Sequence, residues 1–163
     1  GVMYMATQVF DAIFSASDIL SASQKIRFRQ MVRLAALLHD IGHAPFSHTT
    51  ERVMPQVQLL GLSEWAQKNS ERQATHEDYT LKIILHSDIT QRINDTFASL
   101  DINAEMIATI LFSPSLRNQS AFIVDRINFL PLLQKIVSSE LDSDRMYYLK
   151  RDSFFCGVKY GQF

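Results

Sequence analysis

The chain has 163 residues, of which 47% are hydrophobic and 20% are charged. This composition fits one globular domain that buries roughly 70% of its unfolded surface. The net charge of −1 at pH 7 does not indicate a nucleic-acid partner or an anionic membrane. A single cysteine, Cys156, excludes an internal disulfide and is typical of a reducing cytoplasm. The longest apolar run, Leu34 to Leu38, is far shorter than the ~20 residues of a membrane span. We therefore predict a cytoplasmic protein without a membrane partner.

Helical periodicity dominates the first part of the chain. An amphipathic pattern predicts a helix over Val2–Phe14. No capping residue precedes this pattern, and the chain ends as abruptly as it starts, so we interpret the sequence as part of a longer protein. Ser23 is predicted to cap a second helix that reaches Leu38. Gly42 and Pro45 then predict a tight break, followed by a short helix over 49–53.

The second part of the chain is predicted to be helical as well. The capping box Thr75-His76-Glu77-Asp78 starts a helix that reaches Leu85. Further helices are predicted over Ile89–Phe97, Ala104–Phe112 and Leu132–Val137, the last with Pro131 in its first turn. A final helix is predicted from a cap at Asp142 or Ser143 to about Phe155, and Gly157 ends it. Only Ala121–Val124 is compatible with a strand. Cys156 is interpreted as a core residue because two phenylalanines precede it. The predicted fold is all-α.

A cluster of histidines with one carboxylate suggests the chemistry. His39, Asp40, His43 and His48 lie within ten residues. Side chains of adjacent helical residues diverge by about 100°, so His39 and Asp40 can bind one ion only if it lies beyond the helix end. Imidazole and carboxylate together suit Zn, Fe, Mn or, less well, Mg. Gly42 allows a sharp turn that presents His43 and His48 toward the same cavity.

A simpler interpretation of the His-Asp pair is a hydrogen-bonded helix cap. Taken alone, such a pair is more often a cap than a metal site. The additional histidines favour the metal site, because a surface loop has no need for three imidazoles.

The motif resembles that of a known enzyme family. The segment Leu-Leu-His-Asp-Ile-Gly-His-Ala-Pro-Phe-Ser-His is similar to the signature of HD-domain phosphohydrolases. Within them it most resembles the deoxynucleoside triphosphate triphosphohydrolases, the branch of the human SAM-and-HD-domain dNTPase. Thr75-His76-Glu77 resembles a later Thr-His-Glu of that branch, and Leu141-Asp142-Ser143-Asp144-Arg145-Met146-Tyr147-Tyr148-Leu149 resembles its distal helix. The opening Gly1-Val2 is similar to the end of a segment that carries the first metal-binding histidine of the family.

The resemblance implies an HD-domain helical bundle over residues 1–163, truncated at both ends. It implies that His39, Asp40 and Asp144 bind a divalent metal ion, with a fourth ligand, a histidine, before Gly1. His43, His48 and His76 match histidines that line the phosphate site, and His76 matches the proton donor.

The last predicted helix contributes the substrate residues in this interpretation. Arg145, Tyr148 and Asp152 match residues that hold phosphate and sugar. Their spacing of three and four places them on one face of a helix, which without the motif would be interpreted as a solvated, ion-paired surface. The family has Asp where this chain has Tyr147, a position off that face, so we expect altered packing there.

The implied reaction is hydrolysis of a deoxynucleoside triphosphate to deoxynucleoside and inorganic triphosphate. Arg145, with His43 or His48 as cations, would stabilise phosphate charge, and His76 would act as the acid. Glu77 either orients His76 or only favours the first turn of its helix. Two alternatives stay open: hydrolysis of another phosphoester, such as a cyclic nucleotide or an alarmone, and a silent nucleotide-sensing module. The metal, the preferred base and the oligomeric state, including a homo-oligomer, are not determined by the sequence.

Overall fold

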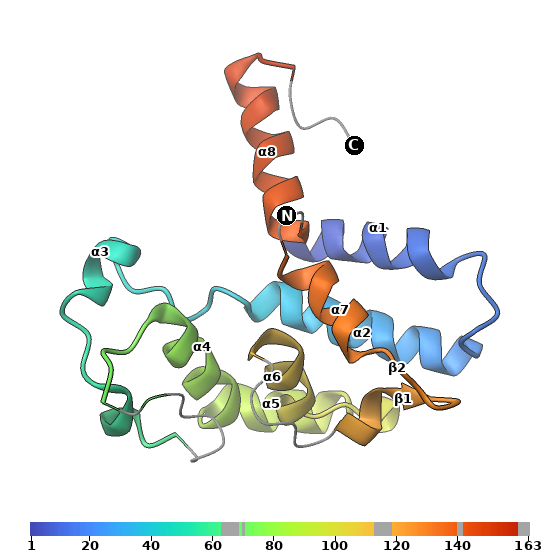
Figure 1. The fold of residues 1–163 in the computed structure, drawn as a ribbon, viewed down its shortest axis with the longest axis horizontal. Coiled ribbons are helices and arrows are strands. Elements are labelled where there is room, and N and C mark those ends of the chain that lie inside the picture. Colours follow the sequence, from blue (N-terminus) through green and yellow to red (C-terminus); the bar gives the residue numbers. More distant parts are fainter. Residues whose placement is uncertain (63–68, 70, 113–118, 140–141, 160–163) are drawn as a thin grey trace. The chain divides into compact units, whose positions relative to one another are not determined.

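The computed structural model describes residues 1–62, 69, 71–112, 119–139 and 142–159. The chain forms two compact units, and each is described by itself (Figure 1). Unit 1 comprises Gly1–Leu37 and Gln119–Phe163, and unit 2 comprises Leu38–Asn118. Regular structure is almost entirely helical, with one two-stranded sheet among the described residues. The predicted all-α class is confirmed.

The elements of unit 1 are α1 (Val2–Phe14), α2 (Ala22–Leu38, whose last residue opens unit 2), the 3-10 helix η4 (Gln119–Phe122), β1 (Ile123–Val124), β2 (Ile127–Asn128), α7 (Leu130–Val137) and α8 (Ser143–Cys156). Those of unit 2 are α3 (His48–Glu51), η1 (Val57–Leu60), α4 (His76–Leu85), α5 (Asp88–Thr96), η3 (Ala98–Leu100) and α6 (Ala104–Phe112).

The core of unit 1 is rich in phenylalanine. Phe10 and Phe14 of α1 lie with ring centroids 4.6 Å apart, and Phe129 lies 6.1 Å from Phe14 and 5.7 Å from Phe28 of α2. Such tilted ring pairs add to the stabilisation from burying their area. Helix α1 also packs against α7 and α8, and in Figure 1 α8 rises from the end of α1 at which the chain starts.

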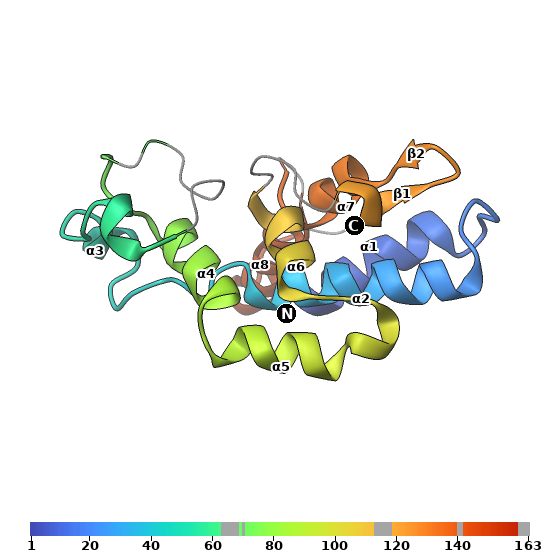
Figure 2. The same cartoon turned by 90° about the horizontal axis from the view of Figure 1, so that it is seen from below.

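Unit 2 is built around α4, α5 and α6, which pack on one another (Figure 2). Ile84, Ile93 and Ile107, one from each helix, are buried. Asn94 of α5 accepts the backbone N–H of Ala104 at 2.9 Å and thereby satisfies a free donor at the start of α6. This packing fixes α4, whose first turn carries a histidine of the predicted site.

The start of α4 agrees with the capping box predicted from the sequence. Thr75 is the N-cap, and its backbone N–H donates to Asp78 at 2.8 Å. Arg72 binds the same buried carboxylate with two guanidinium nitrogens, at 2.6 and 2.7 Å. Burial raises the pKa of Asp78, but the hydrogen bonds from Arg72 and Thr75 outweigh this effect, so the pKa lies below its usual value. The first turn of α4 is thereby held by an ionised side chain.

Two local predictions were wrong, the cap of α2 and the burial of Cys156, and the strand prediction was incomplete. Helix α2 begins before Ser23: the hydroxyl of Ser21 accepts the N–H of Gln24, and the Gln24 side chain accepts the N–H of Ser21. The strand predicted within Ala121–Val124 is present as β1, which is half of a hairpin in which Asp125 and Arg126 turn the chain with positive φ angles of 48° and 68°.

Cys156 is exposed rather than a core residue. Phe154 and Phe155, which suggested burial, are themselves 80% and 78% exposed in the last turn of α8. An apolar neighbourhood in sequence therefore did not produce an apolar environment at this helix end.

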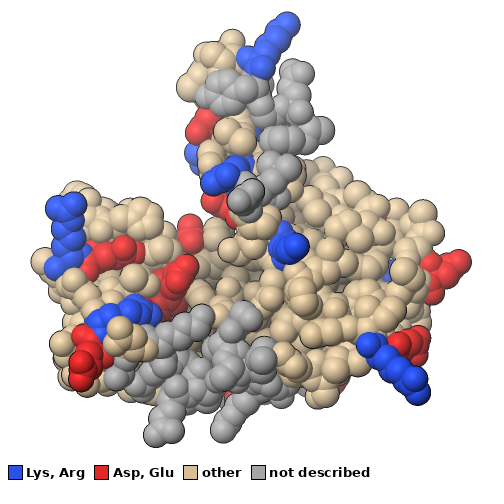
Figure 3. Space-filling model, viewed as in Figure 1, with Lys and Arg blue, Asp and Glu red and all other residues tan. Residues whose placement is uncertain are grey.

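On the face shown in Figure 3, no broad patch of one sign forms among the described residues. No helix in the described part of the chain combines the length and the apolarity that a membrane crossing needs.

Candidate functional site

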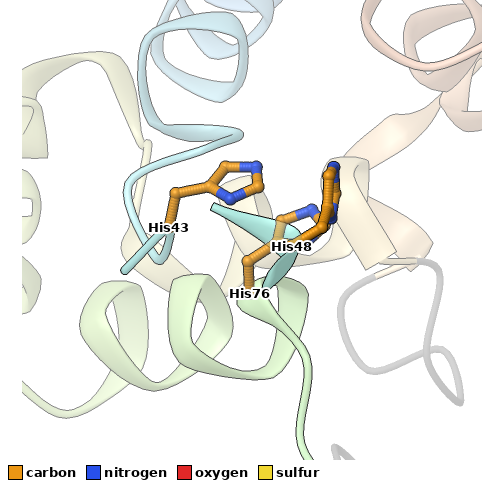
Figure 4. A group of neighbouring side chains, drawn as sticks. All are labelled: His43, His48 and His76. Atoms are coloured by element: carbon orange, nitrogen blue, oxygen red, sulfur yellow. The ribbon is translucent and has the colours of Figure 1, made fainter. Parts of the chain in front are cut away.

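Three histidines from separate segments gather over the first turn of α4 (Figure 4). His43 lies in the loop after α2, His48 begins α3 and His76 begins α4. The rings of His43 and His76 stack with centroids 3.9 Å apart and planes 8° from parallel. The ring of His48 meets these two rings edge-on, at 5.0 and 5.1 Å. The structure thus brings together the three histidines that the sequence singled out.

Solvent reaches the cluster from the side of His48. The side chain of His48 is 70% exposed, whereas those of His43 and His76 are 22% and 18% exposed. A ligand approaching from solvent therefore meets His48 first, with the stacked pair behind it.

Gly42 makes the stacking possible. Its N–H donates to the hydroxyl of buried Thr80 at 3.0 Å, and that hydroxyl donates to the carbonyl of His39 at 3.2 Å. A Cβ atom at Gly42 would lie 2.2 Å from the carbonyl oxygen of His76 and 2.3 Å from the Thr80 nitrogen. The sequence predicted a sharp turn at Gly42, but its φ is not positive. The glycine is needed because the loop lies directly against α4.

Glu51 of α3 anchors the cluster. Its Oε1 lies 2.5 Å from Nδ1 of His76 and 3.3 Å from Nδ1 of His48, and it accepts the backbone N–H of His76 at 3.2 Å. These hydrogen bonds, first among them the one from the His76 ring, lower the pKa of Glu51 to about 2. An ionised carboxylate only accepts hydrogen bonds, so Nδ1 of His76 carries the hydrogen, and Nε2 is left for a ligand.

His43 differs from the cationic role considered from the sequence. Burial lowers the pKa of His43, and the neighbouring His76 lowers it further, against the opposing effect of Asp40. A lowered pKa favours the neutral ring at neutral pH. His43 is therefore suited to hydrogen bonding rather than to charge neutralisation.

His39 and Asp40 follow directly after α2 and fit a divalent ion. Nε2 of His39 is buried and lies 3.5 Å from Oδ2 of Asp40. Two ligand atoms at ~2.1 Å from a tetrahedral ion are about 3.4 Å apart. The pair thus has the spacing and the donor chemistry of two ligands of one Zn, Fe or Mn ion.

The histidine cluster also offers potential ligand atoms. One ring nitrogen from each of His43, His48 and His76 lies within 4.8 Å of the others. However, the nitrogen lone pairs of two stacked rings lie in parallel planes, so an ion bound by His43 and His76 requires one ring to rotate. The cluster could hold a metal ion only after that rearrangement, whereas the His39–Asp40 pair is already spaced for one.

The other four residues singled out from the sequence lie on α8, in unit 1. Helix α8 is continuous over Ser143–Cys156, so Arg145, Tyr148 and Asp152 share one side of it. Asp152 forms an ion pair with Arg151 at 2.8 Å, and Asp144 lies in the first turn. Their roles, and that of Asp144 as a metal ligand, stay predictions.

Sequence reasoning missed two residues of this site. Glu51, rather than the neighbouring Glu77, binds the His76 ring, and Thr80 ties the loop after α2 to α4. The spacing of three between His48 and Glu51 was a local signal that pairs Glu51 with His48, but it does not point to His76. Nothing local pointed to Thr80.

One family matches most of the chain in comparisons with known proteins. The family described as HD domain matches residues 2–130. An uncharacterized protein YwfO of Bacillus subtilis is 29% identical over the whole chain, which covers 29% of that protein. A deoxynucleoside triphosphate triphosphohydrolase SAMHD1 homolog of Dictyostelium discoideum is 31% identical over 96% of the chain and 26% of its own length. The crystal structure of a phosphohydrolase from Bacteroides thetaiotaomicron matches with a TM-score of 0.56 and 26% identity, over 96% of this chain and 28% of the other. The chain thus spans less than a third of the length of these proteins.

Proposed function

The chain belongs to the HD-domain family, and from this membership we propose that the protein is a metal-dependent phosphohydrolase acting on deoxynucleoside triphosphates. One observation carries the proposal: three imidazoles with a carboxylate anchor adjoin a His-Asp pair that is spaced for one ion. Potential metal ligands lie next to the ring of His43, whose neutral form is favoured, and the exposed ring of His48. This combination of groups suits hydrolysis of a phosphoester. The names of the Dictyostelium and Bacteroides relatives support the same reaction class.

The proposed metal ligands are His39, Asp40 and Asp144. The first two have the spacing described above, and Asp144 is proposed from its motif alone. When bound, a divalent ion (Mn, Fe, Zn or Mg) supplies a water of lowered pKa and polarises a phosphoryl oxygen.

His76 is the proposed acid. The oxygen of water forms a bond to the α-phosphorus and its proton passes to the solvent, while the bond to the 5′ oxygen breaks and that oxygen takes a proton from Nε2 of the doubly protonated His76 ring. Glu51 holds the opposite nitrogen of the ring, so that Nε2 keeps its orientation during the transfer. The products are a deoxynucleoside and inorganic triphosphate.

The remaining residues hold the substrate. His43 and His48 donate hydrogen bonds to phosphate oxygens, the exposed His48 from the solvent side. Arg145, Tyr148 and Asp152, which share one side of α8, bind phosphate and sugar. The ring of Tyr148 disfavours a 2′-hydroxyl, so dATP should be a better substrate than ATP.

A nucleotide panel tests this function. The intact protein, supplied with Mn²⁺, is given the four dNTPs, ATP, a cyclic nucleotide and an alarmone, and the products are separated by anion exchange. We expect triphosphate and deoxynucleoside from several dNTPs, with a lower kcat/KM for ATP than for dATP. Turnover of only the cyclic nucleotide or the alarmone would assign a different phosphoester, and nucleotide binding without turnover would indicate a sensing module.

A further inference from the structure

Ser47 occupies an N-cap position without capping its helix. Serine is among the preferred N-cap residues because its hydroxyl accepts a backbone N–H of the first turn. Ser47 precedes α3, yet its side chain makes no such hydrogen bond. Its hydroxyl instead lies 3.2 Å from Nδ1 of His43, four residues earlier.

The backbone around Ser47 is in a disfavoured conformation. Ser47 has a φ of 52° and a ψ of −131°, and the preceding Phe46 has a φ of 66°. A side chain with a Cβ atom is strained there, and glycine is the residue that adopts such angles readily. Serine at this position therefore retains a hydroxyl at the expense of local stability, a combination that often marks functional segments.

The surroundings of His43 determine whether the Ser47 hydroxyl donates or accepts the hydrogen bond. On its other side, Nε2 of His43 lies 3.7 Å from Oδ2 of Asp40. The negative charge of this carboxylate favours the tautomer of the neutral ring that carries its hydrogen on Nε2, and in that tautomer Nδ1 is an acceptor. The Ser47 hydroxyl consequently donates to Nδ1, and the ring is held between Ser47 and Asp40.

We infer that Ser47 is a positioning residue, which fixes the tautomer and the orientation of His43 so that its Nε2–H stays directed toward Asp40 and the proposed phosphate site. The inference rests on the proposed function for its kinetic consequence only. The contact itself is a property of the fold of unit 2. Loss of the hydroxyl should free the ring of His43 without removing any group that touches the substrate.

Two substitutions separate the hydroxyl from the backbone. Ser47→Ala removes the hydroxyl and keeps the strained Cβ, whereas Ser47→Gly removes the hydroxyl and relieves the strain. In the intact protein labelled with ¹⁵N-histidine, long-range ¹H–¹⁵N spectra in alkaline buffer should show Nδ1 of His43 moving toward its unbonded value in both variants. With dNTP, kcat/KM should fall roughly 3- to 10-fold in both, as expected for loss of one ordinary hydrogen bond, while Ser47→Gly should be the more thermostable of the two.

Ser87 provides the matched control. It is an N-cap serine of unit 2 whose side chain does accept a helix N–H, that of Ile89 at 3.1 Å. Ser87→Ala should lower thermal stability and leave the His43 resonances and kcat/KM unchanged. Unchanged His43 resonances in both Ser47 variants, or wild-type kcat/KM in Ser47→Gly, would overturn the inference. If the wild-type protein hydrolyses no dNTP, the proposed function fails, while the resonances still decide the role of Ser47.

Discussion

His76 reaches the cluster with one ring nitrogen already bound by Glu51, which leaves a single nitrogen for chemistry. As the proposed acid, it should act on the chemical step alone. His76→Ala is expected to lower kcat by about 10²- to 10⁴-fold, with the metal content of the protein unchanged. Steady-state kinetics and elemental analysis of the same preparation measure both. Loss of the metal in this variant would show that His76 is a ligand instead of the acid.

Glu51 and Glu77 form a matched pair for the orienting carboxylate. Glu51→Gln keeps the shape but removes the charge that orients His76, and a hydrogen bond to a charged group contributes about 1.5–3 kcal/mol. We expect kcat to fall about 10- to 100-fold, the equivalent of that range. The hydrogen bond of the His76 ring goes to Glu51 and not to Glu77, so Glu77→Gln should stay within about twofold of wild type. The reverse ranking would contradict the anchor role of Glu51.

The lowered pKa of Glu51 also predicts a dependence of stability on pH. The folded-state pKa of about 2 lies below the ordinary value of 4.5, so the unfolded chain takes up the proton first as the pH falls. The stabilisation from ionised Glu51 is therefore complete above pH 4.5 and is lost as the pH falls toward 2. Thermal midpoints of wild type and Glu51→Gln should converge across this range. A constant difference between them down to pH 2 would argue against the shift.

At the residue scale, the sequence identified the three histidines but not the carboxylate that orients His76. His43, His48 and His76 were singled out by motif, and the structure brings their rings together. Glu77, adjacent to His76, was the carboxylate considered for orienting it, whereas Glu51 is 25 positions away. A partner so distant depends on how two helices pack, and residue spacing in one segment carries no information about that.

At the scale of elements, the loop after α2 lies against α4 through Gly42. In Gly42→Ala the new methyl group would overlap backbone atoms of His76 and Thr80, so the loop must move away from α4. We expect a loss of about 1–3 kcal/mol in the free energy of unfolding, typical of overpacking, together with a loss of most activity because His43 and His76 separate. Urea unfolding and dNTP hydrolysis measure the two effects.

Gly61 is the control for this substitution. It also lies in unit 2, with a φ of 64°, and beyond its two chain neighbours no heavy atom of the described residues lies within 4 Å of the place that a Cβ atom would take. Gly61→Ala should cost about 1 kcal/mol of stability through backbone strain and leave activity intact. Equal activity in the two variants would show that the close approach at Gly42 does not hold the histidines.

Helix positions followed local signals wherever those signals were unambiguous. The ranges Val2–Phe14 and Ala104–Phe112 coincide with α1 and α6, and the capping box at Thr75 starts α4. The cap of α2 was misplaced because Ser21 and Ser23 are both suitable residue types, and only the reciprocal hydrogen bonds with Gln24 select Ser21. The second strand of the hairpin was missed because two residues carry no detectable periodicity.

At the scale of the whole chain, composition and periodicity sufficed for the all-α class but not for the two units. Unit 1 combines the first and the last part of the chain, and unit 2 is the segment between them in the sequence; nothing in the composition distinguishes these segments. The proposed metal ligands come from both units, because His39 and Asp40 lie in unit 2 and Asp144 lies in unit 1. If all three bind one ion, metal binding and the stability of the whole chain are linked.

Asp40→Asn tests this link in the intact protein, because it removes the charge of a proposed ligand with little change of shape. We expect metal content to fall at least tenfold, triphosphohydrolase activity to fall with it, and the rise in thermal midpoint on adding Mn²⁺ to disappear. Asp144→Asn should behave in the same way. Asp125 is exposed in the hairpin turn with a positive φ of 48°, which asparagine tolerates, so Asp125→Asn should keep the metal, the activity and the response to Mn²⁺. Full metal occupancy and activity in Asp40→Asn would refute the metal site, while full occupancy in Asp144→Asn alone would remove Asp144 from the ligands and leave His39 and Asp40 in place.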